Sequence, residues 1–113
     1  MLFNAKSRED ILNGKKTQTR RCRRSGVAVP GALHWAQTKL FDKSTRFARL
    51  RILNVWEWDG NTITPEDVKA EGYNTKSEFL NAYRSMNHNR IGKPGYTHYA
   101  IEFEVVSYET TQE

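Results

Sequence analysis

The chain has 113 residues and a formal net charge of +5, which exclude a large multidomain protein and favour one small basic domain. Hydrophobic residues make up 37% and aromatic residues 12% of the sequence, as is typical of a folded domain rather than a disordered chain. The first residues form no apolar signal segment and no run of about 18 apolar residues occurs, so we expect an intracellular, cytoplasmic protein that makes no membrane contact.

The first predicted element is a short helix that begins after Ser7 and ends at Gly14. Ser7, with Asp10 three residues later, has the pattern of an N-terminal cap, and glycine commonly follows the last helical residue. Weaker patterns indicate two strands at 17–22 and 33–41.

A longer strand is predicted over residues 47–58. Alternation places five apolar side chains on one face: Ala48, Leu50, Ile52, Trp56 and Trp58. The opposite face begins with Arg49 and Arg51 and continues with Leu53 and Val55. We therefore expect the second half of the strand to be covered on both sides and its tryptophans to lie in the core.

Two more helices are predicted after this strand. Thr64 followed by Pro65 predicts the start of one helix, and Gly72 predicts its end. Thr75 and Glu78 have the capping-box spacing that begins the other. In that third helix, four residues at i, i+3, i+4 and i+7 are expected to face the core: Phe79, Ala82, Tyr83 and Met86.

The clearest strand pattern covers residues 96–106, where Tyr99, Ile101, Phe103 and Val105 alternate with more polar residues. Together the elements predict a single domain over residues 1–107, followed by a polar tail at 108–113. Its predicted class is α+β, mainly β: a partly open β-barrel of about five to six strands with about three short helices.

Positive charge is concentrated in the first half of the chain. Residues 1–56 contain thirteen Lys and Arg against three Asp and Glu, whereas residues 57–113 contain five against ten. This asymmetry predicts a basic face that meets a polyanion. The alternative is that the two halves attract each other across the fold.

Residues 15–24 hold six of the eighteen Lys and Arg, and like charges so close together are best tolerated where an anionic ligand meets them. The same segment contains Cys22, the single cysteine, so no internal disulfide is expected. Cys22 and the three histidines have no zinc-binding spacing, and we expect neither a metal nor a cofactor.

Residues 14–21 read Gly-Lys-Lys-Thr-Gln-Thr-Arg-Arg and resemble the hallmark motif of the ASCH family, Gly-x-Lys-x-x-Thr-x-Arg. Gly14, Lys16, Thr19 and Arg21 occupy its four fixed positions. The resemblance implies a PUA-like β-barrel, a fold associated with RNA and modified nucleobases.

The resemblance continues along nearly the whole chain. It includes the Trp-Glu-Trp of residues 56–58, the Ala-Glu-Gly-Tyr of residues 70–73 and the Ile-Glu-Phe of residues 101–103. The family is biochemically diverse, so a shared fold does not by itself define an activity.

Some small bacterial ASCH proteins are amidohydrolases that remove the acetyl group from N4-acetylcytidine. They use a lysine and a threonine of the hallmark motif and a glutamate from a later helix. The resemblance implies that Lys16, Thr19 and Glu71 are the corresponding catalytic residues, with a gap of one residue in the match to Glu71. Other members have been described as ribonucleases or RNA-binding regulators, and both remain alternatives.

Hydrolysis of an amide on a nucleobase needs a nucleophile, a base and an acid. Thr19 can supply the hydroxyl, and Lys16 can act as base if burial and nearby cations lower its pKa. Glu71 can protonate the leaving nitrogen. A carboxylate at the C-terminal end of a helix opposes the helix dipole, which favours a functional role for Glu71. Residues three apart in a regular strand face opposite sides, so Lys16 and Thr19 share a pocket only if the chain bends near Lys16.

The remaining candidate residues are expected to bind a nucleoside or single-stranded RNA. Six are arginines: Arg20, Arg21, Arg23, Arg24, Arg49 and Arg51. Trp35 is the candidate for stacking on a base. The sequence leaves the oligomeric state open and favours a monomer.

Two classes of function remain open at this point. A deeply buried Lys16 beside an uncharged pocket favours an amidohydrolase. A continuous basic groove through Arg23, Arg49 and Arg51 favours a non-catalytic module that binds RNA or reads modified bases.

Overall fold

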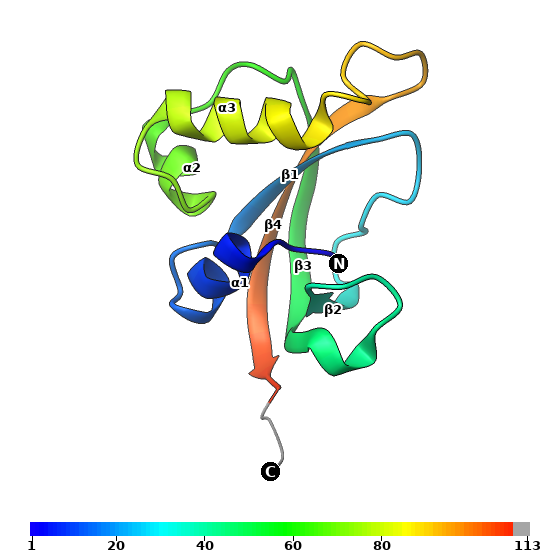
Figure 1. Cartoon of the computed structure of the whole chain (residues 1–113), viewed down its shortest axis with the longest axis vertical. Helices are drawn as coiled ribbons and strands as arrows, with labels where there is room; N and C mark the ends of the chain where they lie inside the picture. Colours follow the sequence, from blue (N-terminus) through cyan, green and yellow to red (C-terminus); the bar gives the residue numbers. More distant parts are fainter. Residues whose placement is uncertain (110–113) are drawn as a thin grey trace.

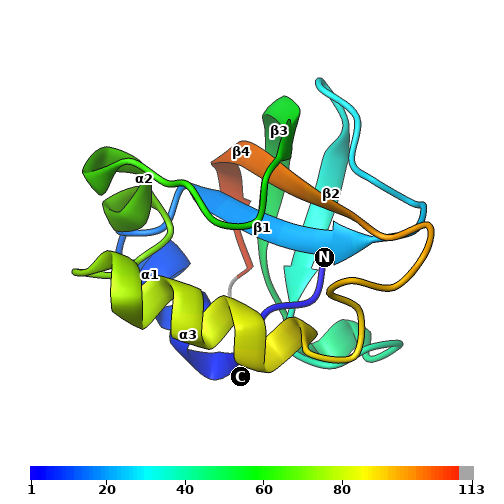
Figure 2. The same cartoon turned by 90° about the horizontal axis from the view of Figure 1, so that it is seen from above.

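The computed structural model describes residues 1–109 (Figure 1). Its elements in chain order are α1 (Ala5–Leu12), β1 (Gln18–Arg23), β2 (Leu33–Gln37), the 3₁₀ turn η1 (Lys43–Thr45), β3 (Arg46–Trp58), α2 (Pro65–Ala70), α3 (Lys76–Asn87) and β4 (Thr97–Tyr108). The strands pair antiparallel in the order β1-β4-β3-β2 and curl into a half-barrel (Figure 2). The predicted α+β, mainly β class is confirmed, with four strands among the described residues instead of five to six.

The N-terminal caps of α2 and α3 are those expected from the sequence. Thr64 and Thr75 each accept a hydrogen bond from the backbone N–H three residues later. The cap of α1 differs: Asn4 accepts from the N–H of Ser7 at 2.8 Å, so the cap lies three residues before the predicted one and the helix begins at Ala5. Gly14 follows the end of α1 with a φ of 73°, as expected for a glycine after a helix.

Two hydrophobic cores cover the two faces of the sheet. The first contains Phe3, Ile11, Ala36, Phe47, Ala48, Leu50, Ile52, Ile101 and Phe103. The second contains Cys22, Ile63, Val68, Phe79, Leu80 and Tyr83. Through these residues, α1 packs on one face of the sheet, and α2 and α3 pack on the other.

The core-facing stripe of α3 differs at its C-terminal end from the predicted one. Phe79 and Tyr83 are buried as expected, and Leu80 is buried with them. Met86 is 60% exposed, because the last turn of α3 borders the cavity described below and not the core.

A β-bulge in β3 changes the face on which its tryptophans lie. Ile52 pairs with Phe103, but Trp56 pairs with Ala100, because the register shifts directly after Ile52. Paired residues share a face and neighbouring residues alternate, so Trp56 and Trp58 lie on the face covered by α2 and α3. The prediction that they share a face with Ile52 is therefore wrong. Trp58 packs against the second core, whereas Trp56 is 37% exposed.

Two strand boundaries differ from those expected. Strand β2 ends at Gln37, so residues 38–41 are not part of it. Strand β4 reaches Tyr108, one residue beyond the predicted domain boundary, and residues 110–113 of the predicted tail lie outside the described residues. Within residues 1–109, none of the helices has the length and apolarity that a membrane crossing needs.

Candidate functional site

The segment that carries the Gly-x-Lys-x-x-Thr-x-Arg pattern folds as a turn followed by a strand. After Gly14, the N–H groups of Lys15 and Lys16 both donate to the carbonyl of Asp10, at 2.8 and 3.1 Å. The N–H of Thr17 then donates to the carbonyl of Ala70 at 2.8 Å, which holds the turn against the end of α2. Strand β1 begins only at Gln18, so the alternation of a strand does not determine where the Lys16 side chain points.

Lys16 and Glu71 form a buried ion pair. Lys16 Nζ donates to the Glu71 backbone carbonyl at 2.9 Å and to Glu71 Oε1 at 3.2 Å. The two residues are only 5% and 2% exposed. Glu71 is the C-cap of α2, and its other carboxylate oxygen accepts from Arg20 Nη1 at 2.9 Å. Two cations therefore offset the unfavourable position of this carboxylate at the end of a helix.

Arg20 joins this pair to a second carboxylate. Its guanidinium lies 3.4 Å from Asp67 Oδ2 and donates to Gln18 Oε1 at 2.9 Å. The Gln18 amide in turn donates to Asp67 Oδ1 at 3.0 Å. The guanidinium also lies over the Trp58 ring, 5.0 Å from its centroid. The charge of Arg20 is thus engaged inside the protein by α2 and by the second core.

Burial lowers the pKa of Lys16 below its usual value of 10.5. The charge and hydrogen bond of Glu71 act in the opposite direction and favour the ammonium form. The charges of Arg21 and Lys6 lower the pKa further. Arg21 belongs to the same sequence motif as Lys16, whereas Lys6 belongs to α1 and acts on Lys16 through the fold.

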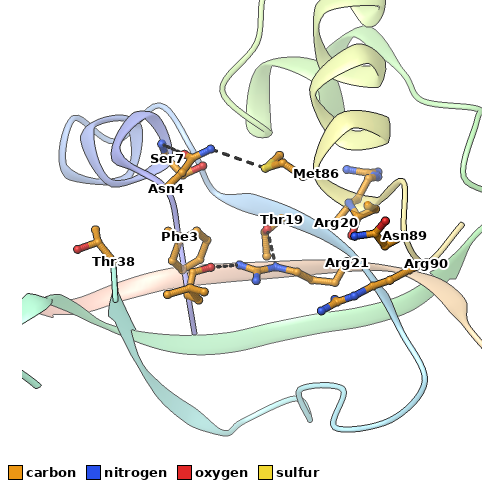
Figure 3. Close-up of a pocket in the computed structure, with 12 residues that line it drawn as sticks. Phe3, Asn4, Ser7, Thr19, Arg20, Arg21, Thr38, Met86, Asn89 and Arg90 are labelled. Atoms are coloured by element: carbon orange, nitrogen blue, oxygen red, sulfur yellow. Dashed lines mark hydrogen bonds between the residues drawn. The ribbon is translucent and has the colours of Figure 1, made fainter. Parts of the chain in front are cut away.

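A cavity of about 470 Å³ lies beside this cluster (Figure 3). It is lined by Leu2, Phe3, Asn4 and Ser7 at the N-terminal end, Thr19, Arg20 and Arg21 of β1, Thr38 after β2, and Met86, Asn87, Asn89 and Arg90 at the end of α3 and beyond. Thr19 and Arg21 therefore reach the cavity, whereas the buried Lys16 and Glu71 are not among the residues that line it.

Arg21 is held in place along the cavity wall. Its Nε donates to Thr19 Oγ1 at 3.2 Å, and its Nη2 donates to the Leu2 carbonyl at 2.9 Å. The guanidinium lies 4.8 Å from the centroid of the Phe3 ring. Figure 3 shows Arg21 extended between β1 and the N-terminal segment, with Thr19 directly above it.

The other predicted binding residues lie elsewhere on the molecule. Arg23 borders a second, smaller cavity of about 180 Å³, which also includes Arg21 and His34. Arg24 lies over the Tyr96 ring at 5.1 Å.

Trp35 is contacted by two guanidinium groups, those of Arg46 and Arg49, each 4.8 Å from its ring centroid. Arg51 forms an exposed ion pair with Glu104 at 2.9 Å. Arg49 and Arg51 border neither of the two cavities. Among the described residues, therefore, Arg23, Arg49 and Arg51 do not meet in one cavity.

Sequence reasoning identified three of the twelve residues that line the cavity, Thr19, Arg20 and Arg21, and missed the rest of its wall. The N-terminal residues Phe3 and Asn4 and the loop residues Asn89 and Arg90 carry no motif, and Met86 has the spacing of a core residue. The run Asn-His-Asn-Arg at 87–90 is rich in donors and acceptors and is the one local signal that distinguishes this loop.

No protein-family model matches the chain, and no curated protein matches its sequence. Solved structures resemble it in fold. A DUF984 protein of Enterococcus faecalis V583 matches with a TM-score of 0.68 and 18% identity over 99% of this chain and 82% of that one. An ASCH domain of Lactobacillus crispatus JV V101 matches with a TM-score of 0.68 and 16% identity over 91% of this chain and 71% of that one.

A mutant of the ASCH protein of Zymomonas mobilis matches with a TM-score of 0.61 and 14% identity, over 97% of this chain and 71% of that one. At these identities the likeness concerns the fold alone. The curled antiparallel sheet, the order of the three helices and these matches together show that the chain has the PUA-like fold of ASCH domains.

Proposed function

We propose that the 470 Å³ cavity binds a nucleobase-containing ligand. One observation carries this proposal: two fixed positions of the ASCH-like motif, Thr19 and Arg21, line the cavity, and a third, Lys16, is buried against Glu71. The volume lies within the range of about 300–1,000 Å³ that is usual for small-molecule sites.

The chemistry of the lining supports a base as the ligand. Asn4 and Asn89 carry amides, and Ser7 and Thr19 carry hydroxyls, so the wall offers both donors and acceptors. Unstacked bases are recognised by such groups on their Watson–Crick and Hoogsteen edges. The apolar side chains of Phe3 and Met86 supply surface for the ring itself.

The binding proposal is tested by calorimetric titration with cytidine and N4-acetylcytidine. Thr19→Val keeps the shape of the side chain and removes its hydroxyl, so we expect affinity to fall about tenfold through loss of a hydrogen bond. Thr97→Val on β4 is the matched control, because Thr97 borders neither cavity. Wild-type protein that binds no nucleoside at millimolar concentration contradicts the proposal.

A catalytic role is the second candidate: the buried Lys16 with its lowered pKa favours it, whereas the three arginines of the cavity wall differ from the uncharged lining expected for an amidohydrolase. In this reaction Lys16 first gives a proton to Glu71, and Thr19 Oγ1 then attacks the acyl carbon of an N4-acylated cytosine and passes its proton to the resulting neutral amine. The amide C–N bond breaks, N4 takes up a proton supplied through Glu71, and water hydrolyses the Thr19 ester to release the acid. The hydrogen bond from Arg21 Nε stabilises negative charge on Thr19 Oγ1.

This mechanism requires one local rearrangement. Lys16 Nζ donates to Glu71, and no hydrogen bond joins it to Thr19 within residues 1–109. Lys16 Nζ must therefore turn from Glu71 so that it accepts a hydrogen bond from the Thr19 hydroxyl when substrate is bound. Catalytic contacts often tighten only in the substrate complex.

The catalytic candidate is tested by chromatography of cytidine released from N4-acetylcytidine. Lys16→Ala, Thr19→Ala and the double mutant should lose similar, non-additive amounts of activity, because the two residues act as a unit. Lys15→Ala is the matched control, since Lys15 is the exposed neighbour. Turnover that survives Lys16→Ala in a folded variant eliminates this mechanism. A wild type that binds the nucleoside without turnover is a reader of modified bases.

A further inference from the structure

The cavity wall carries positive charge that carboxylates neutralise only in part. Three arginines line it, and none of the described lining residues is acidic. Arg20 is paired with Glu71 and Asp67. Within residues 1–109, neither Arg21 nor Arg90 has a carboxylate within ion-pair distance.

These two unpaired cations lie close to each other. The charges of Arg23 and Arg90, together with the larger effect of burial, lower the pKa of Arg21 to about 10. Figure 3 shows Arg90 beside Arg21, on the side of the cavity away from Asn4 and Ser7. Like charges at the wall of a partly buried cavity repel each other, and an anion between them removes that repulsion.

Hydrogen bonds to other groups hold the guanidinium groups of Arg21 and Arg90 in place and leave some of their N–H donors free. Arg21 uses Nε for Thr19 and Nη2 for the Leu2 carbonyl, and Arg90 uses Nη1 for the Cys22 carbonyl at 3.2 Å. Among the described residues, Arg21 Nη1 and Arg90 Nη2 have no protein acceptor. Fixed guanidinium groups with free N–H donors are the usual partners of phosphate oxygens.

We propose that Arg21 and Arg90 form an anion subsite for the phosphate of a nucleotide, so that the ligand of the cavity is a phosphorylated nucleoside. This inference rests on the proposed nucleobase site and names its substrate class. The neutral end of the cavity, with Asn4 and Ser7, holds the base. The arginine end holds the phosphate, which is the anion that accompanies a base in nucleotides and in RNA.

The test is a calorimetric comparison of cytidine and adenosine with their 5′-monophosphates, and of inorganic phosphate, at low salt. We expect each monophosphate to bind at least about tenfold more tightly than its nucleoside, because charge-assisted hydrogen bonds to the phosphate add to its affinity. Arg90→Gln should remove most of this ratio, because it lowers the affinity for the monophosphate more than the affinity for the nucleoside, and Arg90→Lys should restore part of it. Arg84→Gln, an exposed arginine of α3 that borders neither cavity, is the matched control for loss of charge.

The outcomes separate the anion subsite from the nucleobase site. Equal affinity for nucleoside and monophosphate overturns the subsite and leaves the nucleobase proposal standing. Binding of inorganic phosphate that depends on Arg90, without binding of any nucleoside or nucleotide, overturns both the nucleobase proposal and the assignment of the subsite to a nucleotide phosphate, and leaves an anion site alone. A protein that binds none of these probes overturns both.

Discussion

Lys16 and Glu71 are 55 residues apart in the chain, yet a single ammonium group binds both the backbone carbonyl and the carboxylate of Glu71. The contact ties the turn before β1 to the end of α2. It also holds together two of the three residues to which the resemblance assigns catalysis. The same contact therefore contributes to the stability of the fold and to the proposed chemistry.

Glu71→Ala should destabilise the protein by about 3–5 kcal/mol, because it leaves the buried cations Lys16 and Arg20 without their shared partner. Urea denaturation measures the free energy of unfolding. Glu57→Ala, at an exposed position of β3, should change it by no more than about 0.5 kcal/mol. If Glu71→Ala lowers the free energy of unfolding by less than about 1 kcal/mol, the ion pair of Glu71 with Lys16 is not buried as described.

Phe103→Ala should lower the free energy of unfolding by about 3–5 kcal/mol, since truncation of a buried aromatic residue leaves a cavity. Phe103 is 2% exposed and its ring centroid lies 6.2 Å from that of Phe3. Val106→Ala on the same strand is the control, because Val106 is 38% exposed. Equal effects of the two substitutions mean that the face of β4 has been wrongly assigned.

Local chemistry accounts for what the sequence predicted correctly. Thr64 and Thr75 cap their helices through hydrogen bonds that span only three residues, so neighbouring residues suffice to identify them. The bulge after Ile52 has no such local signal, since it depends on pairing with β4. Asn4, not Ser7, caps α1, and its neighbour Phe3 is buried in the first core, a tertiary contact that the residues of the helix do not reveal.

In the candidate site too, the sequence identified the residues that belong to a local motif and missed those that tertiary contacts bring to the cavity. The motif identified Thr19 and Arg21, which line the cavity, and Lys16, which lies behind it. Arg90 comes from a loop that folds back onto β1, where it donates to the carbonyl of Cys22. That contact joins residues 68 apart in sequence, so no local pattern reveals it.

Acid should weaken the packing of α3 on the sheet through His98. Tyr83 Oη lies 2.6 Å from His98 Nδ1, which accepts this hydrogen bond only when the ring is neutral. Burial lowers the pKa of His98 below 6.5, so the unfolded state binds the proton more readily. The free energy of unfolding should therefore decrease as the pH falls below about 6.5.

Urea denaturation between pH 8 and 5 measures this slope. His98→Asn should reduce it, and the slope should not vanish, because burial also lowers the pKa of His34. His88→Asn, at an exposed position, is the matched control. A wild-type slope that His98→Asn does not alter contradicts the assignment.

Binding of single-stranded RNA, tested by fluorescence anisotropy, should weaken steeply as salt increases, because phosphate contacts release counterions. Replacing Arg23 and Arg24 together by Ala should reduce the slope of log K against log salt by about 2 at most. Arg51→Ala should reduce this slope less than Arg23→Ala or Arg24→Ala alone, because Arg51 is paired with Glu104. The absence of RNA binding at low salt rules out a polymeric partner and leaves a mononucleotide or nucleoside.

The central claim is that a nucleobase-containing ligand occupies the cavity between β1, the N-terminal segment and the end of α3. Amide chemical-shift mapping of labelled protein during titration with 5′-CMP tests it most directly. We predict that the largest saturable shifts fall on Phe3, Thr19, Arg21, Asn89 and Arg90, which line that cavity. Shifts concentrated instead around Trp35 and Arg49 on β2 and β3, or no saturable shift at all, would contradict it.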